Sequence, residues 1–224
     1  MLRTAVKTDL PEIVSLWQKA FGDSPEAVSF FFQSFPDCVS YVAEEAGALV
    51  SMVHALPQLL SPQIPAAYVY AVATRKTHRG RGLCRALMAF AEADLKGRGF
   101  ACCVLTPGAS SLFDYYDRLG YHTAFTRQRT DFEQGRPIPL TEYLTRRERL
   151  LTGPHMVCDE ALLSYAARVY DLTFFETADG IAAAGPAYTA EVLPQDLGGS
   201  PFAMLKWLTE AQPLQDAYLG FALE

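Results

Sequence analysis

The chain has 224 residues, half of them hydrophobic, and a formal net charge of −6 at pH 7. This length and apolar content allow a substantial core, in one large domain or in a domain with a smaller appendage. The acidic balance excludes a general attraction to nucleic acid or to an anionic membrane surface. Any anion that the protein binds must therefore be held by a local group of cations.

The cysteines and the N-terminal segment predict a cytoplasmic protein. The five cysteines are odd in number, lie mostly in apolar runs, and show neither a CxxC spacing nor a matched histidine pair. The first residues carry Lys7, Asp9 and Glu12 and include no apolar stretch long enough for a signal peptide or a membrane span. We expect no metal site, no nucleic-acid partner and no membrane partner.

The N-terminal residues predict two helices. Residues 1–6 favour a short strand, and Asp9, Pro11 and Glu12 resemble a capping box at the start of a helix. Ser24 before a proline indicates a second helix. That helix carries an aromatic cluster of Phe30, Phe31, Phe32 and Phe35. Core or lid packing is the simple interpretation of the cluster, and direct ligand contact is the alternative.

A hairpin and a strand–helix–strand unit are expected next. Residues 39–44 and 48–56 predict paired strands that turn at Ala46-Gly47, followed by a loop with Pro57, Pro62 and Pro65. Residues 68–74 and 101–106 are apolar runs typical of buried strands. The helix expected over residues 82–96 joins them and stops at Gly97, so the two strands should be parallel.

The remaining residues predict the end of this α/β layer and a smaller lobe. A helix over residues 110–119 and strands over 122–125 and 128–132 would complete a first domain at about residue 132. Residues 133–139 are expected to be a linker. Beyond it we expect helices near 140–151 and 159–172, a hairpin over 173–193 turning at Asp179-Gly180, a helix near 202–211 and a strand over 217–223.

The turn before the long helix concentrates positive charge. Residues 75–85 carry five cationic side chains and no acidic one. A helix N-terminus offers unpaired N–H groups, and Gly80 and Gly82 would let a phosphate approach them closely. Arg79, Arg81 and Arg85 can add charge-assisted hydrogen bonds. The pattern favours a bound anion, with a solvated basic turn as the alternative interpretation.

The glycine spacing fits neither a P-loop nor a dinucleotide-binding fingerprint, which would need a glycine where Arg85 stands. The stretch VAT-x4-RGRGLCRALM instead resembles motif A of the GNAT superfamily of acyl-CoA-dependent N-acyltransferases, [QR]-x-x-G-x-[GA]. The motif maps onto Arg79, Gly82 and Cys84. Cys84 replaces the usual glycine or alanine, and a redox or acyl-accepting role is the alternative to a place in the turn.

The resemblance implies a GNAT-like α/β (α+β) fold: a mixed, mostly antiparallel sheet with a central parallel β-α-β crossover flanked by helices. It implies that acetyl-CoA is the cosubstrate, with its pantetheine arm on the strand backbone and its diphosphate on the N–H groups of residues 80–84. The implied cofactor-binding residues are Val72, Ala73, Thr74, Arg79, Gly80, Arg81, Gly82, Leu83, Cys84 and Arg85.

Residues 112–121, LFDYYDRLGY, resemble motif B of the same family, FY-x-x-x-G-[FY]. The alignment implies Tyr116 as the general acid, since a phenol with a pKa of about 10 can protonate the departing CoA thiolate. Core packing, the role expected of Tyr115, is the alternative. An asparagine common in relatives is replaced by Ala109, and Ser110 or Ser111 would supply its hydrogen bond to the CoA arm.

The residues do not single out a general base. Glu44, Glu45 and His54 lie on the predicted hairpin and would act directly or through a water, with an ordinary surface or buried polar role as the alternative for each. A backbone N–H near Val72 would stabilise the tetrahedral oxyanion.

The resemblance covers residues 1–132 and implies acetyl transfer to a primary amine of a small molecule or a peptide. The turn is most similar to the branch that includes bacterial aminoglycoside-acetylating survival proteins, which are longer. Residues 133–224 would form a small α+β lobe that walls the acceptor site or makes a homodimer contact. A non-catalytic CoA-binding sensor or partner-docking module, and transfer of a longer acyl group, are the alternative functions.

Overall fold

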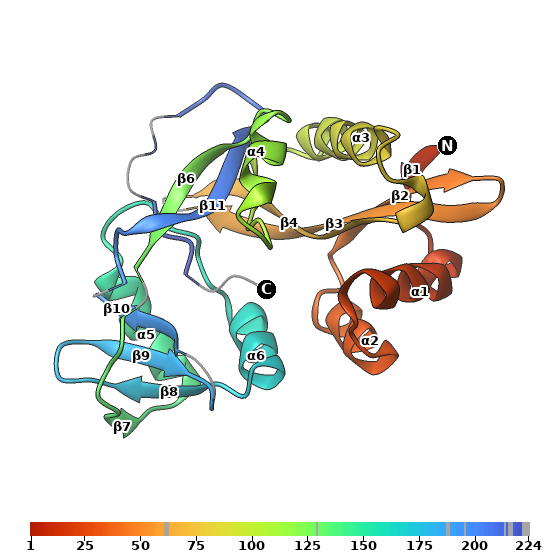
Figure 1. Ribbon diagram of the computed structural model, residues 1–224. Coiled ribbons are helices and arrows are strands. Elements are labelled where there is room, and N and C mark those ends of the chain that lie inside the picture. The colour runs from red at the N-terminus through yellow and green to blue at the C-terminus, as the bar shows by residue number, and fades with distance from the viewer. Residues whose placement is uncertain are drawn as a thin grey trace. The chain divides into compact units, whose positions relative to one another are not determined.

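The computed structural model describes residues 1–60, 63–128, 130–186, 189–194, 196–212, 214 and 217–220. The chain forms two compact units, and most of their elements are labelled in Figure 1. The first unit contains Met1–Gln58, Pro65–Leu105 and Lys206–Ala211, and the second contains Leu59–Ile64, Thr106–Leu205 and Gln212–Glu224. The domain boundary expected at residue 132 falls within the second unit.

The first unit is a sheet with helices, as the resemblance implied. Its elements are β1 (Leu2–Thr4), α1 (Leu10–Phe21), α2 (Pro25–Ser34), β2 (Val39–Glu45), β3 (Ala48–Leu60), β4 (Ile64–Thr74), α3 (Leu83–Gly97) and β5 (Cys102–Leu105). The strands follow the order β1-β2-β3-β4-β5. The first three pair antiparallel, whereas β4 and β5 pair parallel. The mixed α/β fold, the hairpin and the parallel crossover are therefore confirmed.

The polar residues at the start of α1 bind neighbouring segments and do not cap the helix. The carboxylate of Asp9 accepts hydrogen bonds from the backbone N of Val6 (2.8 Å) and from Arg3 (2.6 Å). Glu12 accepts one from the backbone N of Leu49 on β3 (2.9 Å). The capping box expected between Asp9 and Glu12 was wrong, because Asp9 instead bonds back to Val6 across the 3-10 turn Lys7–Asp9 that precedes α1, and Glu12 bonds to β3. Ser24 does cap α2, by accepting from the backbone N of Ala27 (3.2 Å).

Two of the prolines expected in a loop lie inside strands. Pro57 belongs to β3 and Pro65 to β4, and both are exposed, while Pro62 lies outside the described residues. Proline is tolerated in a strand where its nitrogen is not needed by the ladder. The two strands are therefore longer than the sequence predicted.

Aromatic packing makes much of the core of the first unit. Trp17 of α1 lies 5.0 Å from Phe31 of α2, measured between ring centroids, and Phe31 lies 5.4 Å from Tyr70 of β4. Phe31 and Phe35 are buried. Rings at these separations contribute favourable edge and offset contacts besides the area that they bury. Core packing is therefore confirmed for these two phenylalanines of the predicted cluster.

The second unit combines short helices with two sheet segments. Its elements are α4 (Ser111–Asp117), β6 (His122–Arg127), β7 (Arg136–Pro137), α5 (Leu140–Leu150), α6 (Glu160–Val169), β8 (Thr173–Glu176), β9 (Ile181–Ala184), β10 (Thr189–Leu193) and β11 (Ser200–Trp207), whose end belongs to the first unit. An antiparallel sheet has the order β10-β9-β8-β7. None of the helices in the described part of the chain has the length and apolar character that a membrane span requires.

The partner of β6 differs from the expected one. The sequence predicted a strand over residues 128–132 and a helix near 202–211, and both predictions were wrong: the described residues 128 and 130–132 form no strand, and β6 pairs antiparallel with β11, which includes residues 202–207. Residue 129 lies outside the described residues. The segment of β11 contains Ala203, Met204 and Leu205, which tolerate a helix as well as a strand. Pairing with β6 makes this segment a strand, because the stability of a strand depends more on its neighbouring strands than on the intrinsic preference of its residues. In place of the strand expected over 217–223, the described residues form two isolated β-bridges, Ala217 with Phe125 and Tyr218 with His155. Residues 221–224 lie outside the described residues.

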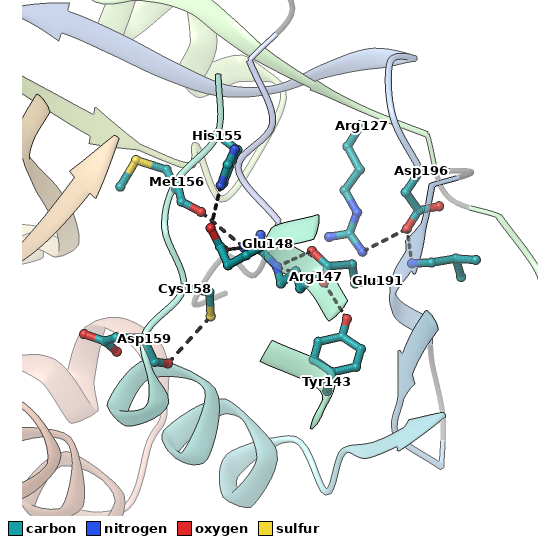
Figure 2. A network of polar contacts seen from close by, with 11 residues as sticks. Arg127, Tyr143, Arg147, Glu148, His155, Met156, Cys158, Asp159, Glu191 and Asp196 are labelled. Atoms are coloured by element: carbon teal, nitrogen blue, oxygen red, sulfur yellow. Dashed lines mark hydrogen bonds and ion pairs between the residues drawn. The ribbon is translucent and has the colours of Figure 1, made fainter. Parts of the chain in front are cut away.

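A buried ion pair joins α5 and β10 in the second unit (Figure 2). Arg147 of α5 and Glu191 of β10 are both fully buried, and Arg147 Nε lies 3.1 Å from Glu191 Oε2. The hydroxyl of Tyr143 donates to the same carboxylate, and burial together with Glu191 raises the pKa of this phenol. Gly220 packs against the pair, because a Cβ there would lie 2.2 Å from Arg147 Nη2. The pair joins a helix, a strand and the C-terminal segment.

Removing one partner of this pair should be costly. We expect Glu191→Leu to lower the free energy of unfolding of the second unit by up to about 3–5 kcal/mol, because it leaves the fully buried Arg147 with only the partly exposed Glu148, 3.3 Å away, as an acidic partner among the described residues. The double variant Arg147→Met/Glu191→Leu should recover most of that loss. Urea unfolding monitored by circular dichroism measures both. Glu176→Leu is the matched control, since Glu176 is a partly exposed acid paired with Arg136 in the same sheet. An equal loss in Glu191→Leu and the control would contradict the account.

Candidate functional site

The site begins where β4 and β5 separate. Their parallel register runs from Ala66 opposite Cys102 to Tyr68 opposite Val104. β5 ends at Leu105, whereas β4 continues to Thr74, so the later part of β4 has no β5 residue beside it. Ala71 lies in this part and has a φ of +48°, which is unusual for a residue with a side chain. The backbone therefore changes direction within β4 just before Val72.

The later part of β4 is anchored to β3. The hydroxyl of Ser51 donates to the carbonyl oxygen of Ala73 (2.9 Å), and the backbone N of Arg75 donates to the carbonyl of Val50 (2.8 Å). The carbonyl oxygen of Thr74 accepts from Arg79 Nε (3.0 Å). Of the three strand residues predicted to bind a ligand, two thus have carbonyls that already accept a hydrogen bond within the protein. The third, Val72, is half-buried.

Two glycines shape the turn between β4 and α3. Gly80 has a φ of +74° and Gly82 a φ of +76°, in the left-handed region that favours glycine. No atom lies within 4 Å of a Cβ built at either position, so the need for glycine is conformational and not steric. Gly82 is the N-cap of α3 and offers no side-chain oxygen to the first-turn N–H groups. Those groups, which belong to residues that include Leu83, Cys84 and Arg85, could bind an anion at this end of the helix.

The cations of the turn are not equally available. Arg75 donates from Nε to the carbonyl of Leu49 and lies 3.7 Å from Glu12. Arg81 Nη2 lies 3.0 Å from Glu45 Oε2. Lys76 and Arg85 are exposed and make no ion pair with the part of the chain that the structure describes. The turn therefore keeps a positive excess, although acidic residues of α1 and β2 offset part of it.

The residues of the predicted catalytic end belong to the second unit, whereas the turn belongs to the first. Ser110 and Ser111 are exposed at the start of α4. Tyr116 is buried, at 8% exposure, and its ring packs edge-on against Tyr115 (5.3 Å) and Tyr121 (5.8 Å), measured between centroids. The structure thus holds the phenol of Tyr116 in an aromatic surrounding.

The three candidate bases are occupied or enclosed. Glu44 accepts from Arg3 (3.0 Å), and Glu45 holds Arg81. His54 is fully buried, and its Nδ1 lies 2.7 Å from the hydroxyl of Ser40. Burial lowers the pKa of His54 to about 3, so the imidazole is neutral and a weak base at physiological pH. Its Nε2 has no hydrogen-bond partner among the described residues.

Sequence reasoning missed two features of this site. No residue pattern signalled the left-handed Ala71, because the strand run reads as continuous and apolar. The pairing of Glu45 with Arg81 was also missed, although an acidic residue beside the Ala46-Gly47 turn was the available signal. Both depend on how β2, β3 and β4 are placed beside one another.

The sequence and the fold are similar to known proteins. A family model described as an acetyltransferase (GNAT) domain matches residues 1–124, which is more than half of the chain. No curated protein matches the sequence. Among solved structures, a conserved protein of unknown function from Enterococcus faecalis has a TM-score of 0.65 and 19% identity over 83% of this chain and 55% of its own. A GCN5-related N-acetyltransferase from Kribbella flavida has a TM-score of 0.65 and 17% identity over 93% of this chain and 72% of its own.

These identities show the fold alone. The chain spans about half the length of the Enterococcus protein, since it covers 55% of it. The family model, by contrast, covers the turn, the separating strands and α4 within a single match.

The left-handed turn gives a first prediction for this site. We expect Gly82→Ala to lower the free energy of unfolding by roughly 1–2 kcal/mol, because alanine is strained at a φ of +76°. Gly97→Ala in the exposed last turn of α3 is the matched control and should raise stability by roughly 0.5–1 kcal/mol. Chemical denaturation measures both variants. A Gly82→Ala variant as stable as the wild type would show that the turn does not need its left-handed conformation.

The buried His54 gives a second prediction. The folded protein keeps His54 neutral, because its pKa is lowered to about 3, whereas the unfolded chain binds a proton near pH 6.5. The stability contribution is therefore intact above about pH 6.5 and is lost as the pH falls, by about 2 kcal/mol between pH 7 and pH 5. His54→Gln, which cannot titrate, should show a shallower decline of unfolding free energy over this interval. Parallel curves for the two proteins would contradict the assignment.

Proposed function

Because the chain belongs to the GNAT acetyltransferase family, we propose that it transfers an acetyl group from acetyl-CoA to a primary amine of a small molecule or a peptide. The observation that supports this most strongly is the turn between β4 and α3, with left-handed Gly80 and Gly82 before an uncapped helix N-terminus. A diphosphate is the group that such a turn binds best, because N–H groups, the helix dipole and arginines converge on it.

The cofactor would lie along the separated part of β4 and the turn. The pantetheine arm pairs with the backbone at residues 72–74, on the side that β5 leaves open after Tyr68. The diphosphate accepts hydrogen bonds from the N–H groups of residues 80–84. Arg79 and Arg85 add positive charge beside it, and Ser110 or Ser111 holds the arm in place of an asparagine.

The chemistry needs one carbon–nitrogen bond to form and one carbon–sulfur bond to break. The neutral amine attacks the thioester carbonyl, and the N–H of Val72 stabilises the resulting oxyanion. As the intermediate collapses, the CoA thiolate leaves and takes a proton from the hydroxyl of Tyr116. The phenol regains its proton from solvent, and the ammonium group of the intermediate loses one to water.

No side chain is assigned as the general base. Glu44 and Glu45 are held by arginines, and the low pKa of His54 makes it too weak to deprotonate an ammonium group. The acceptor would therefore react as the fraction of amine that is already neutral. This lack of a base is also the observation that favours the second candidate function, a non-catalytic CoA-binding sensor or partner-docking module.

The remaining assignments follow from this proposal. Residues 1–132 act as the acetyl-CoA-binding catalytic domain, and residues 133–224 wall the acceptor site or form a homodimer contact. Transfer of a longer acyl group is the alternative, and the volume available beside Val72 would determine which acyl groups fit. A cytoplasmic location remains a prediction.

A kinetic test separates the enzyme from the binding module. We expect Tyr116→Phe to lower kcat by about 100-fold or more, because general acid catalysis contributes 10²–10⁴-fold. Tyr115→Phe, the neighbouring packing residue, is the control and should retain most activity. Release of free CoA thiol is measured with acetyl-CoA and a broad panel of amines. Binding of acetyl-CoA without thiol release on any amine would favour the non-catalytic module, and an unchanged kcat in Tyr116→Phe would remove Tyr116 as the acid.

A further inference from the structure

One carboxylate contacts an arginine and a histidine of the turn. Glu45 is the last residue of β2, and its Oε1 and Oε2 lie 3.1 Å and 3.0 Å from Arg81 Nη2. His78 Nε2 lies 3.7 Å from the same carboxylate. The adjacent acid, Glu44, binds Arg3 instead, because successive strand residues point to opposite faces. Glu45 is thus an acid that the fold directs at the candidate phosphate site.

The contact between Glu45 and Arg81 is easy to exchange. The side chains of Arg81 and Glu45 are 52% and 31% exposed, so both charges stay largely hydrated. Exposed ion pairs of this kind contribute little to stability. A diphosphate offers more negative charge and more acceptor oxygens to a guanidinium than a carboxylate does. A phosphate bound at the turn would therefore take Arg81 away from Glu45.

We propose that Glu45 competes with the diphosphate of acetyl-CoA for Arg81 and thereby limits the affinity of the turn for cofactor and product alike. The proposal rests on the proposed function. Because product CoA carries the same diphosphate, this competition shortens its lifetime on the protein and favours turnover.

Removal of the competing charge should tighten binding. We expect Glu45→Gln to lower the Kd for CoA by about 3- to 10-fold, since it frees Arg81 to bind the diphosphate. Acetyl-CoA should gain the same factor, because the thioester lies away from the diphosphate. Glu44→Gln is the matched control and should change neither Kd by more than about twofold, because Glu44 faces Arg3. Isothermal titration calorimetry with CoA and acetyl-CoA measures each value.

A double-mutant cycle tests whether Glu45 affects CoA binding through Arg81. Arg81→Gln should weaken CoA binding, and Glu45→Gln should then have no further effect in the Arg81→Gln background. If Glu45→Gln tightens binding by the same factor in both backgrounds, the carboxylate acts without Arg81 and the proposal is overturned. An unchanged or weaker affinity in Glu45→Gln alone overturns it as well. Failure of the wild-type protein to bind CoA at all would instead overturn the proposed function and this inference together.

Discussion

The site depends on the point at which β4 leaves β5. The parallel register with β5 ends at Tyr68, and beyond it β4 is hydrogen-bonded to β3. Because the Ser51 hydroxyl fixes the Ala73 carbonyl, this part of β4 keeps its position although β5 no longer supports it. The left-handed Ala71 and then Gly82 redirect the backbone from the strand into α3. A strand with one open side, followed by an uncapped helix end, is what an extended ligand with a diphosphate requires.

The two units maintain their structure by different physical means. The first packs aromatic rings around the neutral His54, whereas the second encloses the Arg147–Glu191 pair. Protonation of His54 would destabilise the first unit, and loss of either partner of the Arg147–Glu191 pair would destabilise the second. At the turn, by contrast, the charges are exposed and exchangeable, as in the contact between Glu45 and Arg81. The charges that affect stability are thus buried, whereas the charges of the proposed binding turn are exposed.

Local patterns in the sequence predicted the central part of the fold, and distant partners decided the rest. The strand–helix–strand unit and the glycine-containing turn at the start of α3 were predictable, because apolar periodicity and glycine at a helix start act within a few residues. The strand β11 was not, since only pairing with β6 distinguishes it from a helix. Ala71 and the contact of Glu45 with Arg81 were equally hidden, because both arise where separate strands meet.

A crystal structure of the protein with CoA tests the central claim most directly. The account predicts that the diphosphate oxygens lie within hydrogen-bond distance, about 2.7–3.2 Å, of backbone nitrogens of residues 80–84, with the pantetheine arm beside residues 72–74. Density for CoA at any other place, with the turn between β4 and α3 unoccupied, would contradict it.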